Sequence, residues 1–180
     1  MRQKEEVAQL IKTCEAARDS AEAFSRGIDD FSGRVEEQPA VVRPLVKRDF
    51  ESSTGMSVNE WKAFLDKLGA RYGMIYDTAT RLADASHKGN DAEITAAMSA
   101  LKTAAAPFME GVDVAVEAME TMETYLKGLP GKIDLVPDTF MKTEVRDELI
   151  NSVPAYVERA QALKESLKKT KEQLSALVAS

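Results

Sequence analysis

Hydrophobic residues recur at alternating steps of three and four along most of the chain, which is the spacing of one face of an α-helix. Four segments carry such a stripe, which runs from Val7 to Val35, from Val58 to Leu82, from Ile94 to Leu126 and from Val145 to Leu177. We therefore expect four long amphipathic helices, over approximately residues 2–36, 57–88, 91–128 and 139–179.

Short polar and glycine motifs mark the expected helix ends. Ser57 followed by Glu60 forms a capping box, in which the hydroxyl and the carboxylate each accept a backbone N–H. Gly89 favours a left-handed C-cap, and Asn90 can cap the next helix at once. The Gly128–Gly131 segment contains Pro130 and is expected to end the third helix.

Two prolines fall inside the striped segments. Pro107 removes one helical hydrogen bond, and because the stripe continues in register we expect one bent helix there. Pro154 leaves two interpretations open. The fourth helix could bend or break near 152–154, or Asp138 and Ser152 could cap two separate helices on either side of that point.

Four amphipathic helices bury their stripes most simply as an antiparallel up-down-up-down four-helix bundle. The 180 residues suit one all-α domain over residues 1–180. The connection at residues 88–91 is tight, whereas the first and last connections are longer, apolar and proline-containing. A bundle assembled from two hairpins of different chains is an alternative, so oligomerisation stays open.

In this topology both longer connections lie at the same end of the bundle, where we expect six aromatic side chains to gather: Phe31, Phe50, Trp61, Phe64, Tyr125 and Phe140. The connections are apolar enough either to cover the core as a lid or to stay exposed as a contact surface. The candidate partner-binding residues are Val41, Val42, Leu45, Val46, Ile133, Leu135 and Val136.

The charge pattern narrows the range of partners. A formal net charge of −6 argues against nucleic acid as a partner. The third helix carries an acidic strip that suits either a solvated face or docking of a basic partner, namely Glu110, Asp113, Glu117 and Glu120. The fourth helix carries four lysines that suit helical ion pairs or, as the alternative, anionic lipid, namely Lys164, Lys168, Lys169 and Lys171.

The residues needed for familiar catalytic and metal sites are missing. His87 is the only histidine and Cys14 the only cysteine, so a multi-histidine metal site within one chain is ruled out. No Glu or Asp falls on the four stripes, and no phosphate-binding loop is present. We therefore expect no cofactor, no metal and no enzymatic activity.

The chain begins with charged residues rather than a signal sequence, and no apolar run reaches the roughly 18 residues of a membrane span. We expect a cytoplasmic protein, or one exported without a cleaved signal.

These features favour a non-catalytic protein-interaction module, such as an adaptor or a bacterial effector-like protein. One alternative is a small-molecule-sensing four-helix domain excised from a membrane receptor, because both ends of such a bundle emerge together. Another is a membrane-active or lipid-binding bundle whose apolar connections insert into a bilayer.

Overall fold

The computed structural model describes residues 2–179, and every regular element within them is an α-helix, which confirms the all-α prediction. The five helices are α1 (Arg2–Glu36), α2 (Val42–Thr54), α3 (Val58–Lys88), α4 (Asp91–Asp134) and α5 (Thr143–Ala179).

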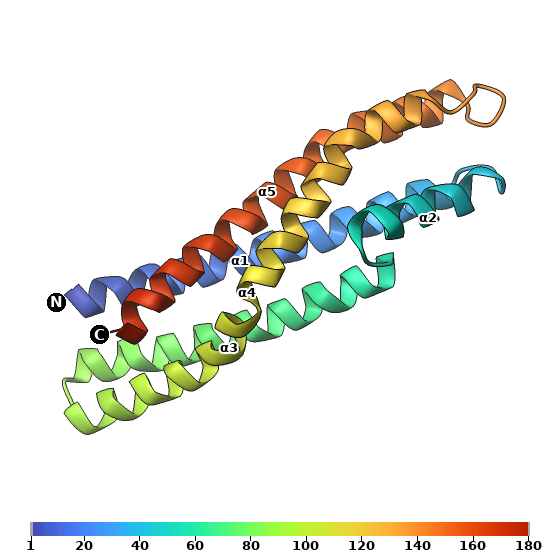
Figure 1. Ribbon diagram of the computed structural model, residues 1–180. Helices are drawn as coiled ribbons and strands as arrows, with labels where there is room; N and C mark the ends of the chain where they lie inside the picture. The colour runs from blue at the N-terminus through green and yellow to red at the C-terminus, as the bar shows by residue number, and fades with distance from the viewer. Residues whose placement is uncertain (1, 180) are drawn as a thin grey trace.

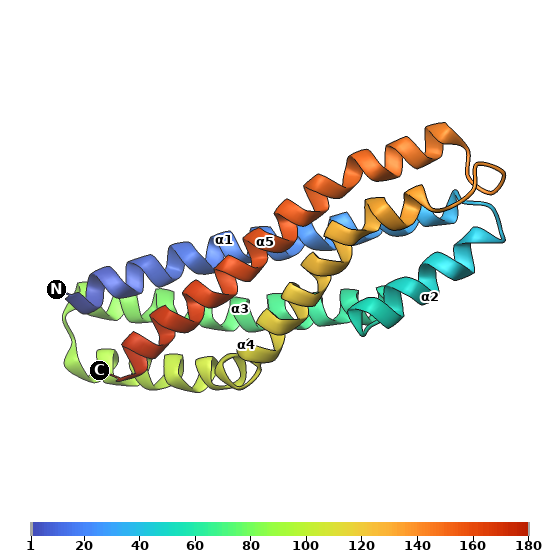
Figure 2. The same ribbon diagram turned by 45° about the horizontal axis from the view of Figure 1, so that its top comes forward.

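The four long helices run along one axis and share one core. α1 packs against α3 and α5, and α4 packs against the same two helices, while the short α2 packs against α4 and α1. Both chain ends and the α3–α4 turn lie at one end of the molecule (Figures 1 and 2). The α1–α2 and α4–α5 connections lie together at the other end, as the sequence predicts.

Helix α2 corrects the sequence interpretation, which treated residues 37–56 as a connection. Val42, Val46 and Phe50 recur at steps of four and turn toward the core. Pro44 is tolerated because it lies in the first turn, where the backbone N–H groups have no helical acceptor. The sequence did not predict this helix, because its apolar stripe contains only three residues and two prolines, Pro39 and Pro44, lie close by.

The end of the third predicted helix is also wrong, because α4 continues through Pro130 to Asp134. The apolar stripe simply extends, with Leu129 and Ile133 buried in the core. Burial of these two side chains outweighs the missing hydrogen bond at Pro130 and the poor helix propensity of Gly128.

The two prolines of the striped segments, Pro107 and Pro154, lie inside continuous helices. α4 passes through Pro107 without a break and changes direction part-way along its length (Figure 2), as the sequence predicts. α5 passes through Pro154, so the interpretation with two separate helices is wrong. The Ser152 hydroxyl donates to the Leu149 carbonyl at 2.6 Å and caps no new helix. α5 starts at Thr143, and Asp138 pairs with Arg146 at 3.1 Å.

The predicted caps around α3 and α4 are confirmed. Ser57 Oγ accepts the Glu60 N–H at 3.2 Å, and Glu60 Oε1 accepts the Ser57 N–H at 3.3 Å. Gly89 adopts a left-handed conformation with φ of 76°. Asn90 Oδ1 accepts the N–H groups of Ala92 and Glu93, which fixes the start of α4 directly after the end of α3.

Candidate functional site

The end with the two long connections is built on an aromatic cluster. Phe31 of α1, Phe50 of α2 and Tyr125 of α4 contact one another, with ring centroids 5.4 to 6.5 Å apart. Tyr156 of α5 meets Phe31 edge to face at 6.3 Å. Four helices therefore contribute one ring each, and three of these four ring pairs have the edge-to-face geometry that aromatic side chains prefer.

Helix α2 is fastened to α4 on the outside of this cluster. Lys132 Nζ donates to Asp49 Oδ2 at 3.0 Å, and to Ser53 Oγ at 3.4 Å. The same ammonium lies over the Tyr125 ring at 5.2 Å, a cation–π contact. These contacts fix the position of α2 against the last turns of α4.

The seven predicted partner-binding residues divide into two groups. Val42 and Ile133 are buried in the core, and Val46 and Val136 are partly buried against it. Three stay exposed, with 62% of Val41, 61% of Leu45 and 83% of Leu135 accessible to solvent. The connections therefore both cover the core and present apolar side chains outward.

Phe140 joins the exposed group with 44% of its area accessible. The sequence predicts that Phe140 lies at this end with the other aromatic side chains, but Phe140 is not one of the seven predicted partner-binding residues. Unlike Phe31, Phe50 and Tyr125, it forms no ring pair among residues 2–179. We call the exposed set the apolar tip, which consists of Val41, Leu45, Leu135 and Phe140.

The Asp49–Lys132 bridge brings the two halves of the tip together. α2 begins at this end and α4 finishes here, so the helices run in opposite directions. Leu45 lies one turn before Asp49, and Leu135 lies about one turn after Lys132. Both leucines therefore lie about one turn beyond the bridge, Leu45 on α2 and Leu135 directly after the end of α4.

Family models, curated proteins and solved structures provide no match to this chain. Its function must be inferred from the surface itself.

Charged residues of opposite sign flank the apolar tip. The first half of α2 carries Arg43, Lys47 and Arg48 without an acid, although Glu36 of α1 pairs with both Lys47 at 2.5 Å and Arg43 at 3.7 Å. Arg48 is exposed and has no ion pair among the described residues. This side of the tip is therefore basic.

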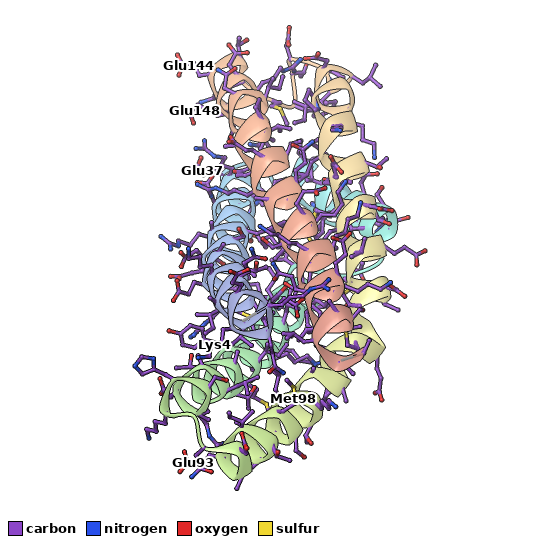
Figure 3. The ribbon with its side chains drawn as sticks, turned by 90° about the vertical axis from the view of Figure 1, so that its left-hand side faces the viewer. Lys4, Glu37, Glu93, Met98, Glu144 and Glu148 are labelled. Atoms are coloured by element: carbon purple, nitrogen blue, oxygen red, sulfur yellow. The ribbon has the colours of Figure 1, made fainter. Side chains whose placement is uncertain are left out.

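The start of α5 is acidic. Glu144 and Asp147 are exposed and unpaired within the described part of the chain, and Glu148 lies 3.6 Å from Arg34. Glu144, Glu148 and Glu37 project outward together at the upper end of the molecule, away from Glu93 near the α3–α4 turn (Figure 3). This corner of the tip therefore concentrates negative charge.

The predicted acidic strip is exposed, and half of it pairs with lysines of α5. Asp113 binds Lys171 at 2.6 Å, and Glu120 lies 4.0 Å from Lys168. Glu110 and Glu117 have no ion pair within residues 2–179. These contacts join two neighbouring helices and reduce the charge that the strip offers to a basic partner.

Glu123 is a buried carboxylate that the sequence did not predict, because it does not lie on any of the four apolar stripes. Glu123 lies between α4 and α5, where it accepts from Gln161 Nε2 at 2.7 Å and Lys164 Nζ at 2.8 Å. Lys127 lies 3.2 Å away. The hydrogen bonds from Lys164 and Gln161 lower the pKa of Glu123 to about 2.

A second polar contact joins α1 to α5 beside the aromatic cluster. The Tyr156 hydroxyl donates to Asp30, which also accepts from Arg34 Nε at 3.0 Å. The Tyr156 hydrogen bond and, to a lesser extent, Arg34 hold the pKa of Asp30 below its ordinary value. The carboxylate is thus a fixed acceptor rather than a proton-transfer group near neutral pH.

The interior next to the aromatic cluster is closely packed. Phe24, Gly27, Phe50, Tyr156 and neighbouring residues line a partly open gap of about 10 Å³, which is no larger than one water molecule. A small organic ligand would therefore have to displace side chains such as Phe50 to enter.

Cys14 is fully buried, and burial raises its thiol pKa to about 12, which keeps it in the unreactive protonated form. His87 is exposed in the last turn of α3.

The residues that the structure describes contain no group of three or more His, Cys, Asp or Glu side chains arranged to hold a metal ion. Between Arg2 and Ala179, no helix is both long enough and apolar enough to span a bilayer.

Proposed function

We propose that this protein is a non-catalytic interaction module that binds a protein partner through the apolar tip. One observation carries the proposal. Among residues 2–179, seven large hydrophobic side chains are exposed; four belong to the tip, whereas Met74, Val114 and Val178 are scattered along three helices. An apolar patch at one end with charged borders has the layout of a contact surface.

The proposal includes an architecture in which four antiparallel rods form an up-down-up-down bundle. α2 and α3 together make the second rod, which is interrupted at Gly55, where φ is 84°. The supporting observation is the closed ring of packing from α1 to α3, α4, α5 and back to α1. Such a frame holds the tip rigid, and a preformed surface loses little entropy on binding.

A cross-linking experiment tests the function. A photo-reactive group is placed at exposed Lys142, beside the tip, and the cross-linked proteins in extracts of the source cells are identified by mass spectrometry. We expect the triple substitution Val41→Ser, Leu45→Ser, Leu135→Ser to remove the specific adduct. The matched control, Met74→Ser with Val114→Ser, removes apolar area elsewhere and should leave the adduct in place.

Equal adduct yields from the wild-type protein and the tip variant would contradict the proposal. Flotation with vesicles of neutral and anionic lipid tests the membrane alternative on the same variants. Tip-dependent flotation without any protein adduct would replace the protein partner by a bilayer.

A further inference from the structure

We infer that the partner of the apolar tip is a second copy of this chain, bound tip to tip around a two-fold axis. The inference rests on the proposed role of the tip as a contact surface. It is drawn from the way in which charge is divided across that surface.

Helices α2 and α5 lie on opposite sides of the tip. α1 and α4 each pack against both α2 and α5, and at this end of the molecule Figure 2 shows α1 and α4 between them. The basic residues of α2 and the acidic residues of α5 therefore occupy opposite borders, with the apolar side chains between the two.

This layout is self-complementary. A two-fold interface places the same patch of both copies in contact, so each residue must meet a suitable residue of its own surface. Suppose that the two-fold axis lies in the plane of contact, passes through the apolar centre and is perpendicular to the line from α2 to α5. In this arrangement α2 of one copy faces α5 of the other. Leu45 and Leu135 then meet apolar side chains, and Arg48 faces Glu144 and Asp147.

Three charged residues at the borders of the tip have no ion pair within the described residues, which supports the two-fold dimer. Arg48, Glu144 and Asp147 are exposed and have no ion pair among residues 2–179, although most charged residues around them do. Pairing across an interface gives each of them a partner. It also fixes the register of the two copies, since like charges placed opposite one another are unfavourable.

The size of the tip sets the expected strength. Four rods, each roughly 10–12 Å wide, give an end face of about 400–600 Å² per copy, or about 800–1,200 Å² in total. This is at the low end for specific complexes, so we expect a weak and reversible dimer.

Sedimentation equilibrium between about 10 μM and 1 mM tests this inference. The wild-type protein should shift from monomer to dimer over that range, and Leu135→Ser should weaken dimerisation at least tenfold. Val114→Ser, at an apolar position on α4 that is 69% exposed and away from the tip, is the matched control and should have no effect.

Charge reversal provides the sharper test. Arg48→Glu places acids against Glu144 and Asp147 in its own dimer, and the double variant Glu144→Lys, Asp147→Lys places bases against Arg48. Each should therefore be monomeric alone, at concentrations where the wild-type protein dimerises. An equimolar mixture should dimerise again, because every contact then joins opposite charges.

The control pair is Lys67→Glu on α3 and Glu110→Lys on α4, both exposed and away from the tip. These variants should dimerise like the wild-type protein, alone and mixed, and far-ultraviolet circular dichroism should show that all variants are folded. A wild-type protein that stays monomeric at 1 mM overturns the inference, and so does a mixture that fails to dimerise.

The two proposals fail in different ways. A monomeric protein that still forms a tip-dependent adduct with another protein overturns the dimer but leaves the proposed function standing. A dimer that is insensitive to Leu135→Ser, together with adducts that are insensitive to the triple substitution, overturns both.

Discussion

At the scale of single residues, Glu123 shows how a charge is held inside a helical protein. Its carboxylate has two strong donors on α5, and its surroundings exclude most water. Removing a hydrogen bond between charged groups costs about 2 kcal/mol when the remaining partner stays partly buried. Lys164 is such a partner, because only 17% of its side chain is exposed.

The first prediction concerns Glu123→Gln. The folded-state pKa of about 2 lies below the ordinary value of 4.5, so the carboxylate stabilises the fold above about pH 5. This contribution disappears as the pH falls from about 5 to about 2. Urea unfolding should show the variant about 2 kcal/mol less stable at pH 7, with the difference closing toward pH 2.

The control is Glu117→Gln, an exposed acid of the same helix without an ion pair. Its free energy of unfolding should stay within about 0.5 kcal/mol of the wild-type value at every pH. A difference for Glu123→Gln that does not depend on pH would show that the carboxylate charge is not what stabilises the contact.

The sequence could not reveal Glu123. It lies one position beyond Met122 of the stripe, where a charged residue normally faces water. Its donors are 38 and 41 residues away along the chain. Which side chains of α5 meet α4 depends on the register between two helices, and the apolar spacing leaves that register open.

At the scale of elements, the corner between α2 and α3 contains a buried hydrogen bond between two side chains. Trp61 Nε1 donates to Thr54 Oγ1 at 3.0 Å, and the Thr54 hydroxyl donates to the Phe50 carbonyl at 2.8 Å. Both side chains are buried, so water cannot replace a lost partner without rearrangement.

The second prediction is that Thr54→Val lowers the free energy of unfolding by about 1–3 kcal/mol, because it leaves the indole N–H buried without an acceptor. Thr54→Ser keeps the hydroxyl and should cost less than about 1 kcal/mol. Urea denaturation followed through fluorescence of the single tryptophan measures both. Equal losses for the two variants would mean that methyl packing, rather than the hydrogen bond, holds the corner.

The third prediction compares two glycines. Gly33 lies on the exposed side of α1, and a Cβ there would meet no atom within 4 Å. Gly33→Ala should therefore raise the free energy of unfolding by about 0.5–1 kcal/mol through helix propensity. Gly89→Ala should lower it by about 1 kcal/mol, because Gly89 is left-handed. Thermal denaturation by circular dichroism should give shifts of opposite sign.

Four of the five helices follow from the sequence because each carries at least seven steps of the apolar pattern. The cap at Ser57 and the turn at Gly89 follow from local chemistry, which needs no knowledge of distant residues. Helix α2 does not follow, because Val42, Val46 and Phe50 span only two turns. Its stability comes from Tyr125 and Lys132, which are far away in the chain.

At the scale of the whole molecule, one core cluster extends through all five helices. The fourth prediction is that the chain unfolds as one unit. Fluorescence of Trp61, at the α2–α3 corner, and far-ultraviolet circular dichroism, which reports all helices, should give coincident urea transitions. Two separate midpoints would show that the end with the apolar tip unfolds independently, against the expectation of a single domain.

The sequence predicts which end of the molecule carries the tip, but not which apolar residues at that end are buried and which are exposed. Val41 is exposed and its neighbour Val42 is buried, because only Val42 lies on the inner side of α2. Predicting which of the two valines is buried requires knowing that Val42–Thr54 is a helix, and the sequence did not indicate that helix. Phe140 stays outside for the same kind of reason, since Met141 takes the buried position beside it.

The shared position of the two chain ends bears on how the protein can be handled. α1 spans 35 residues, so a group coupled to either terminus is held about 50 Å from Leu45 and Leu135. A bead or sensor chip bound through such a group would leave the four apolar side chains facing the bulk liquid. Two copies anchored side by side would point in the same direction and could not meet face to face, so capture on a dense layer should suppress the tip-to-tip dimer that we infer for free solution.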